Sequence, residues 1–270
     1  MWRIAAPMIL SNVSVPLLGM VDTGVMGHLE SPTYLGAVAI GGTIFTFLYI
    51  GMNFLRMGTT GIVAQRYGAE DNDGLRVALG QALIVSLAIA VVILLLQLPI
   101  GKIALSLLGG DFETQSHAAT YFYIRVWSAP GTLANYVLIG WFLGLQNARV
   151  PLLIFLAINI TNILLDLLFV VGFGMKIEGV ALASVIAEYT ALRVAIGFAA
   201  RELRRHPGHW LLARLSRLSA YRAFFAVNAN LFIRTMALMF TFAFITAQGA
   251  RLGPLILAAN AVLINFQNLT

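Results

Sequence analysis

Long apolar segments recur along this chain, and they constrain its fold more than any other feature. Seven of them reach the length of about 20 residues that a helix needs to cross a lipid bilayer. They are residues 4–27, 34–57, 77–99, 117–142, 151–173, 179–200 and 220–247. Hydrophobic residues make up 60% of the chain and charged residues 10%, whereas soluble domains carry about 25% charged residues. One soluble domain cannot bury so many apolar helices, so the sequence predicts an all-α polytopic membrane protein.

The two ends of the chain carry further expectations. The first apolar segment is too long for the core of a signal peptide, so we expect it to remain in the protein as a membrane span. An eighth apolar segment begins near Pro254 and is still apolar at Thr270. A helix over these residues rises only about 24 Å, less than the hydrocarbon core of a bilayer, so we expect the natural protein to continue. The absence of cysteine excludes disulfides and thiolate chemistry.

The distribution of positive charge predicts the orientation in the membrane. The net charge of +6 could indicate a nucleic-acid partner, but the basic residues lie mainly in the links between apolar segments, which excludes that partner. Twelve of them fall towards the side of the N-terminus: Arg3, Arg56, Arg66, Arg76, Arg149, Arg193, Arg201, Arg204, Arg205, Arg214, Arg217 and Arg222. The opposite side has Lys102, Lys176 and Arg251. Positive loops remain inside, so a cytoplasmic N-terminus in a bacterial plasma (inner) membrane is predicted.

A basic link divides the chain into two unequal parts. Residues 201–218 alternate arginines with Trp210 and leucines, which predicts an amphipathic segment on the lipid headgroups. A shift of 222 residues lays residues 32–39 on residues 254–261 with four identities. We therefore predict a six-helix N-terminal bundle (1–200), the cytoplasmic link (201–218) and the first two helices of a second, pseudo-repeated bundle (219–270). Residues 101–108 are expected to form a short interfacial helix.

Charged side chains inside the apolar segments are costly and mark candidate sites. They are Asp22, Arg125, Asp166, Glu188 and Arg234. Asp22 and Asp166 lie at similar depth, because both of their segments run outward. Asn159 and Asn162 precede Asp166 at one-turn spacing, so the three form one polar stripe. We expect this stripe to face an internal cavity that Asp22 completes.

Two interpretations of these groups remain open. They could be hydrogen-bonded packing elements, or they could form a proton or cation site. An amide or hydroxyl serves packing at lower cost than a carboxylate, which favours the ion site. Glu188 either belongs to the same cavity or pairs with Arg125 or another donor. Pro7 and Pro16 bend the first segment, either as a static kink or as a hinge that couples Asp22 to helix movement.

Enzymatic functions find no support in the motifs. The chain has no Gly-x-Gly-Asp motif of an intramembrane aspartyl protease and no Walker loop for a nucleotide. The four histidines lack metal-ligand spacing on one helix face. We therefore expect no enzyme activity, no metal and no cofactor, and an ion gradient as the energy source.

Several short motifs resemble the multidrug and toxic compound extrusion (MATE) family. Residues 21–23 and 26–29 are similar to its first helix, and residues 162–166 with 178–184 are similar to its fifth and sixth helices. Residues 247–253 and 258–261 resemble the branch of the family named for DNA-damage-inducible protein F. The resemblance extends over the whole chain, although about five-twelfths of such a transporter is absent.

The resemblance implies two six-helix bundles around a central cleft, with a coupling site made by Asp22, Asn162 and Asp166. It also implies a role for the Pro7 kink, for Ser184 at a position where relatives carry threonine, and for Asn135 on the fourth helix. We predict a monomeric, proton-coupled antiporter that exports amphipathic, often cationic, small molecules through the bilayer. The alternatives are a sodium-coupled antiporter, a lipid-linked flippase of the same superfamily, and a membrane scaffold without transport activity.

Overall fold

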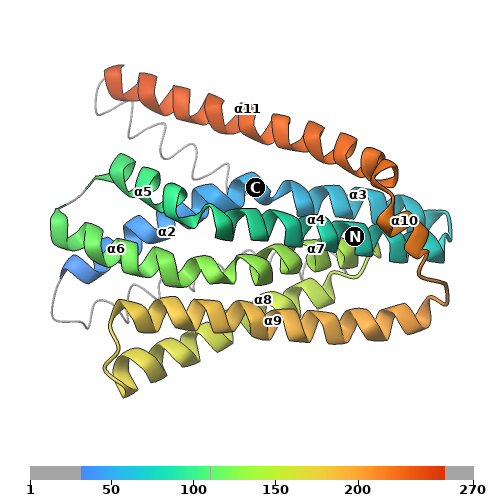
Figure 1. Ribbon diagram of the computed structural model, residues 1–270, viewed down its shortest axis with the longest axis horizontal. Coiled ribbons are helices and arrows are strands. Elements are labelled where there is room, and N and C mark those ends of the chain that lie inside the picture. Colours follow the sequence, from blue (N-terminus) through green and yellow to red (C-terminus); the bar gives the residue numbers. More distant parts are fainter. Residues whose placement is uncertain (1–31, 110, 253–270) are drawn as a thin grey trace.

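The computed structural model describes residues 32–109 and 111–252, and all regular structure within these residues is helical (Figure 1). The longer helices are α2 (Pro32–Met52), α3 (Phe54–Gly68), α4 (Asn72–Leu95), α5 (Gln97–Leu108), α6 (Phe112–Arg125), α7 (Ala129–Gly144), α8 (Arg149–Asp166), α9 (Ile177–Arg205) and α11 (Arg222–Leu252). Short elements are the 3-10 turns Val126–Ser128 and Leu218–Tyr221, the π-helix Leu167–Gly172 and α10 (Leu212–Ser216). The all-α fold class is confirmed.

Four helical stretches in this part of the chain are long and apolar enough to cross a membrane. They are Thr33–Gly68, Asn72–Leu95, Arg149–Gly172 and Ile177–Arg205. They coincide with the predicted segments 34–57, 77–99, 151–173 and 179–200, although the first of them continues to Gly68. The predicted segment 117–142 is divided between α6 and α7, and the predicted segment 220–247 lies within α11. The first and eighth predicted segments lie outside the described residues.

The backbone geometry changes part-way along three of the predicted segments. A turn at Asn53 separates α2 from α3, a 3-10 turn separates α6 from α7, and α8 passes into a π-helix after Asp166. Pro130 stands in the first turn of α7, where its fixed φ and missing N–H are tolerated. Irregular backbone at membrane depth is tolerated where it lines a cavity. Asn53 and Ser128 line such a cavity, described below.

Helix α7 is central to the packing, because it contacts α3, α4, α8 and α9. Its Trp141 is fully buried and donates its indole N–H to the Leu75 carbonyl at 3.2 Å. Figure 1 shows α8 and α9 on one side of α3, α4 and α7, and α11 on the other side. Helix α8 packs mainly on α9, and α6 packs on α2 and α9.

The basic link is anchored on the start of α4. Helix α9 continues to Arg205, five residues into the predicted link, and α5 begins at Gln97, before the predicted 101–108 helix. The buried Arg76 side chain donates to the carbonyls of Leu203 (2.6 Å) and His206 (2.5 Å). Beyond the link, α11 packs against α3 and α2.

Candidate functional site

A polar cavity of about 430 Å³ lies among α2, α3, α6, α7, α8 and α9. Five of the predicted site residues line it: Asn135, Asn159, Asn162, Ser184 and Glu188. They come from three successive long helices, α7, α8 and α9, which pack together in the fold. Polar side chains at membrane depth need such an enclosed space, because lipid cannot hydrogen-bond to them.

Helices α7 and α9 bring Asn135 and Glu188 into contact. The Asn135 amide Nδ2 donates to Glu188 Oε2 at 2.8 Å and to the Glu188 backbone carbonyl at 3.0 Å. The two helices pack closely here, since a Cβ added at Gly131 would lie 3.4 Å from Glu188 Cβ, at the limit of ordinary van der Waals contact. One face of α7 therefore holds the Glu188 carboxylate in a fixed position on the cavity wall.

Helices α8 and α9 carry the predicted polar stripe. Asn162 is almost fully buried and donates through Nδ2 to Ser184 Oγ at 3.4 Å. Asn159 lies one turn earlier on the same face, as its spacing predicted. Asp166 lies one turn later, is fully buried, and does not line the cavity. The partner positions Asp22, Pro7 and Pro16 lie outside the described residues.

Aromatic and basic side chains of α2 and α6 form another part of the cavity wall. Tyr49 Oη lies 3.2 Å from Ser128 Oγ within hydrogen-bonding distance. The Arg125 guanidinium donates to the Tyr121 hydroxyl and lies 5.0 Å from the centre of the Phe45 ring. Glu188 and Arg125 line the same cavity, and the carboxylate of Glu188 is bonded to Asn135. Arg234 does not line it.

The sequence analysis missed several lining residues, and part of the pattern could have revealed them. Tyr49, Asn53 and Arg56 all line the cavity. Their spacing of four and three residues places them on one helical face, as for Asn159 and Asn162. The turn at Asn53 interrupts this face only slightly. A search for polar residues at helical spacing, rather than for charges alone, would have identified it.

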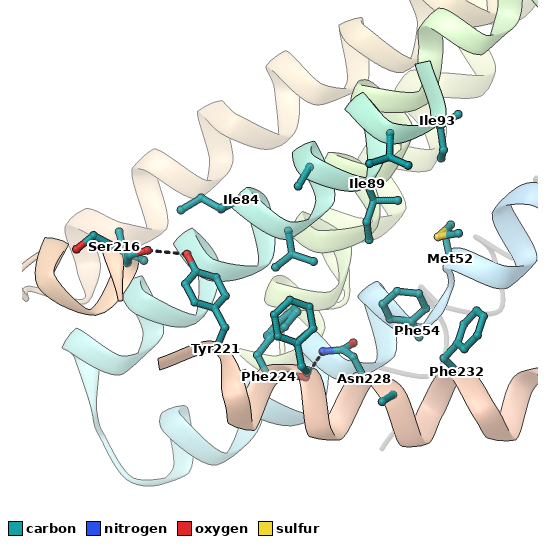
Figure 2. Close-up of a pocket in the computed structure, with 16 residues that line it drawn as sticks. Met52, Phe54, Ile84, Ile89, Ile93, Ser216, Tyr221, Phe224, Asn228 and Phe232 are labelled. Atoms are coloured by element: carbon teal, nitrogen blue, oxygen red, sulfur yellow. Dashed lines mark hydrogen bonds between the residues drawn. The ribbon is translucent and has the colours of Figure 1, made fainter. Parts of the chain in front are cut away.

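A second, larger cavity of about 790 Å³ separates α4 from α11 and is mostly apolar (Figure 2). Ile84 and Ile89 of α4 face Phe224 and Phe232 of α11 across it. Asn228 contributes an amide, whose Nδ2 donates to the Phe224 carbonyl at 2.7 Å. None of the described residues that line this cavity is charged, so they do not support an ion site there. Across the described part of the chain, no three acidic or histidine side chains cluster as metal ligands.

Membrane-length helices around a buried polar cavity define an integral, multi-pass membrane protein. The sequence model of the MatE family matches residues 7–168. The chain belongs to this family of membrane transporters, whose members are not enzymes. The family predicted from the motifs is thereby confirmed.

Relatives support the same assignment over the whole chain. DNA damage-inducible protein F of Escherichia coli K12 is 43% identical over 270 residues, which cover 100% of this chain and 59% of that protein. Multidrug export protein MepA of Staphylococcus aureus NCTC 8325 is 22% identical over 191 residues, 71% of this chain and 42% of MepA. This chain therefore spans about three-fifths or less of the length of these relatives.

Solved structures share the fold. A MOP superfamily transporter from Pyrococcus furiosus superposes with a TM-score of 0.82 and 22% identity, over 99% of this chain and 59% of that one. A MATE crystal structure in the straight conformation gives a TM-score of 0.80 and 20% identity, over 98% of this chain and 59% of that one. At these identities the likeness concerns the fold.

Proposed function

We propose that the protein, at its natural full length, is a proton-coupled antiporter that exports amphipathic small molecules, cations among them, from the cytoplasm. The observation that carries this proposal is the convergence of Asn135, Asn162, Ser184 and Glu188 on one cavity among membrane helices. Relatives named as multidrug export proteins support the direction and the kind of substrate.

The proposed coupling site comprises Asp166, Asn162 and Asp22. An ionised carboxylate is costly at membrane depth, and binding a proton or a cation removes that cost. Asp166 is fully buried one turn beyond Asn162, whose amide already bonds to Ser184. A proton that enters at Asp166 would alter hydrogen bonding along this face of α8. The Pro7 and Pro16 kinks would transmit the change through the first helix.

The proposed architecture has residues 1–200 as one six-helix bundle and residues 219–270 as the start of a second, in a monomer of the plasma membrane. The N-terminus and the basic link would face the cytoplasm. His209 in the link is a suitable reporter, because its side chain is 90% exposed. A cysteine at position 209 should react with an impermeant thiol reagent only in inside-out vesicles. Reaction in intact cells would refute this orientation.

Transport in proteoliposomes, with proton and sodium gradients imposed separately, tests the function. We expect a proton gradient to drive export and Asp166→Asn to abolish it while insertion is preserved, because a buried charge becomes neutral. Asp22→Asn should behave likewise, and Asn162→Ala should be milder. The matched control is Asp111→Asn, in the turn between α5 and α6, which should transport normally.

Each alternative predicts a different result in the same assay. Export that follows only the sodium gradient indicates a sodium-coupled antiporter. Gradient-independent movement of lipid-linked substrates indicates a flippase. If the protein moves no substrate and the two aspartates can be replaced without a phenotype in cells, it is a scaffold. Asp166→Asn export at the wild-type rate under a proton gradient would refute the coupling site.

A further inference from the structure

The backbone of Arg56 is fixed by helix packing beside the polar cavity. It lies in the first turn of α3 and lines the cavity as a half-buried residue. Its backbone carbonyl accepts a hydrogen bond from Thr60 Oγ1 at 2.8 Å. Helix α7 approaches this carbonyl so closely that a Cβ added to Gly140 would lie 2.4 Å from it. The packing of α3 on α7 therefore fixes the position of the Arg56 backbone, from which the side chain extends.

The guanidinium of Arg56 has no hydrogen-bond or ion-pair partner among the residues that the structure describes. By contrast Arg66, three turns later on the same helix, is paired with Asp71 at 3.0 Å in an exposed turn. A guanidinium has five N–H donors and remains charged at all physiological pH values. A charge at membrane depth is costly unless it meets a partner or water. A ligand with an anionic group would supply that partner.

A second guanidinium lines the same cavity. Arg125 is oriented by its hydrogen bond to the Tyr121 hydroxyl and by its position over the Phe45 ring. The carboxylate in the described lining belongs to Glu188 and is bonded to Asn135. Among the residues that the structure describes, the lining thus carries two guanidinium groups and one carboxylate, an excess of one positive charge.

We propose that Arg56 and Arg125 form an anion-binding subsite of this cavity. Its ligands would be small amphipathic molecules that carry a carboxylate, sulfonate or phosphate group. Guanidinium groups bind such groups through paired, charge-assisted hydrogen bonds. Tyr49, Tyr136 and Phe155 of the same lining would contact the apolar part of the ligand. The inference rests on the proposed transport function, because it assumes that the cavity receives cargo, and it adds anions and zwitterions to the substrates.

The charge of the cavity can be measured without transport. Thr46 is an exposed, uncharged lining residue, and the chain has no cysteine, so Thr46→Cys is a single reporter. Its reaction rates with an anionic and a cationic methanethiosulfonate give a ratio that reports the local potential. We expect this ratio to exceed that of Ser106→Cys, an exposed reporter on α5. Arg56→Gln should lower the ratio at position 46 roughly 3- to 10-fold, from the Coulomb energy of one charge in a high effective dielectric.

Two further variants separate charge from folding. Arg56→Lys retains the charge, so its ratio of anionic to cationic reaction rates should stay close to that of the wild type. This expectation holds even if Arg56→Gln reduces stability. Arg66→Gln is the matched control on the same helix and should leave the ratio unchanged. Equal ratios in Arg56→Gln and Arg66→Gln, with both proteins folded, would overturn the proposal.

Ligand protection of the Thr46→Cys reporter tests the subsite directly. Naphthalene-2-sulfonate should protect the reporter from reaction, and Arg56→Gln should raise its half-protecting concentration about tenfold. Naphthalen-2-ylmethanol, which lacks the charge, should protect equally in both proteins. The measurement is made in dodecyl maltoside, which has no anionic group, so that a lipid phosphate can be distinguished from the sulfonate. If the sulfonate protects the reporter strongly only after delipidation, a lipid phosphate is the resident anion. It then occupies the same subsite on Arg56.

Better protection by naphthalen-2-ylmethylammonium than by the sulfonate would overturn the anion subsite. No gradient is imposed in these measurements, so their outcome is independent of the coupling ion. If proton-driven export fails, the protection measurements still test the anion subsite. If the protection measurements contradict the subsite, the proposed export function is not affected.

Discussion

The contact between α3 and α7 gives a sharp prediction, because it depends on two glycines one turn apart. A Cβ added at position 140 would lie 2.4 Å from the Arg56 carbonyl oxygen, and one at position 144 would lie 2.6 Å from Val63 Cβ. Ordinary van der Waals contact begins at 3.4 Å, so Gly140→Ala requires α3 and α7 to separate by about 1 Å. The three nearest atoms at position 140 are the O, C and Cα of Arg56, and these backbone atoms cannot rotate away. Small residues spaced in this way are typical of close membrane-helix contacts.

We expect Gly140→Ala to destabilise the protein by about 1–3 kcal/mol, the usual cost of an overpacked interior. For a protein of this size the corresponding fall in Tm is roughly 2–12 °C. The assay is thermal unfolding of the purified protein in detergent, followed by size-exclusion chromatography with fluorescence detection. The matched control is Gly61→Ala on α3, where an added Cβ meets nothing within 4 Å. This control should be neutral or stabilising, since alanine favours a helix over glycine by up to about 1 kcal/mol.

The result that would refute this reasoning is a Gly140→Ala protein at least as stable as Gly61→Ala. It would mean that α3 and α7 do not meet at this surface. The position of Arg56 on the cavity wall would then lose its support as well.

Two further predictions concern the ends of helices. Arg76→Gln removes the donors to the Leu203 and His206 carbonyls, so the link should loosen. Trypsin should then cleave the link several-fold faster in inside-out vesicles. An unchanged cleavage rate would show that other contacts hold the link. Asp111 caps α6, and its hydrogen bonds to the hydroxyl and the backbone N–H of Thr114 lower its pKa below the usual 3.8. A lowered folded-state pKa contributes stability above pH 3.8 that is lost as the pH falls through the folded-state value. The protection factors of the amides in the first turn of α6 should therefore fall in Asp111→Ala at neutral pH and in the wild type below pH 3.8. Asp111→Asn should stay protected at neutral pH. Equal protection in Asp111→Ala and the wild type at neutral pH would contradict the cap.

The sequence by itself determined the helical segments that the structure describes. Apolar runs of membrane length have few alternatives, because each backbone polar group in lipid must be satisfied within its own helix or barrel. The same local reasoning placed Asn159 and Asn162 on one face, since residues three and four apart share a side of a helix. It also indicated the family, because short motifs are local in the chain.

Only the tertiary structure decided which faces meet. The sequence left open whether Glu188 belongs to the cavity or pairs with Arg125 or another donor, and the packing of α7 on α9 brought it to Asn135 on the cavity wall. Arg56 was counted as a residue near one membrane face, and the approach of α7 at Gly140 placed it in the polar cavity. The sequence predicted a link on the headgroups, and only the structure shows that the buried Arg76 anchors the start of this link to α4. Helical periodicity gives the direction of each side chain about its own axis, but the rotation and depth of one helix against another depend on close packing between residues far apart in the chain.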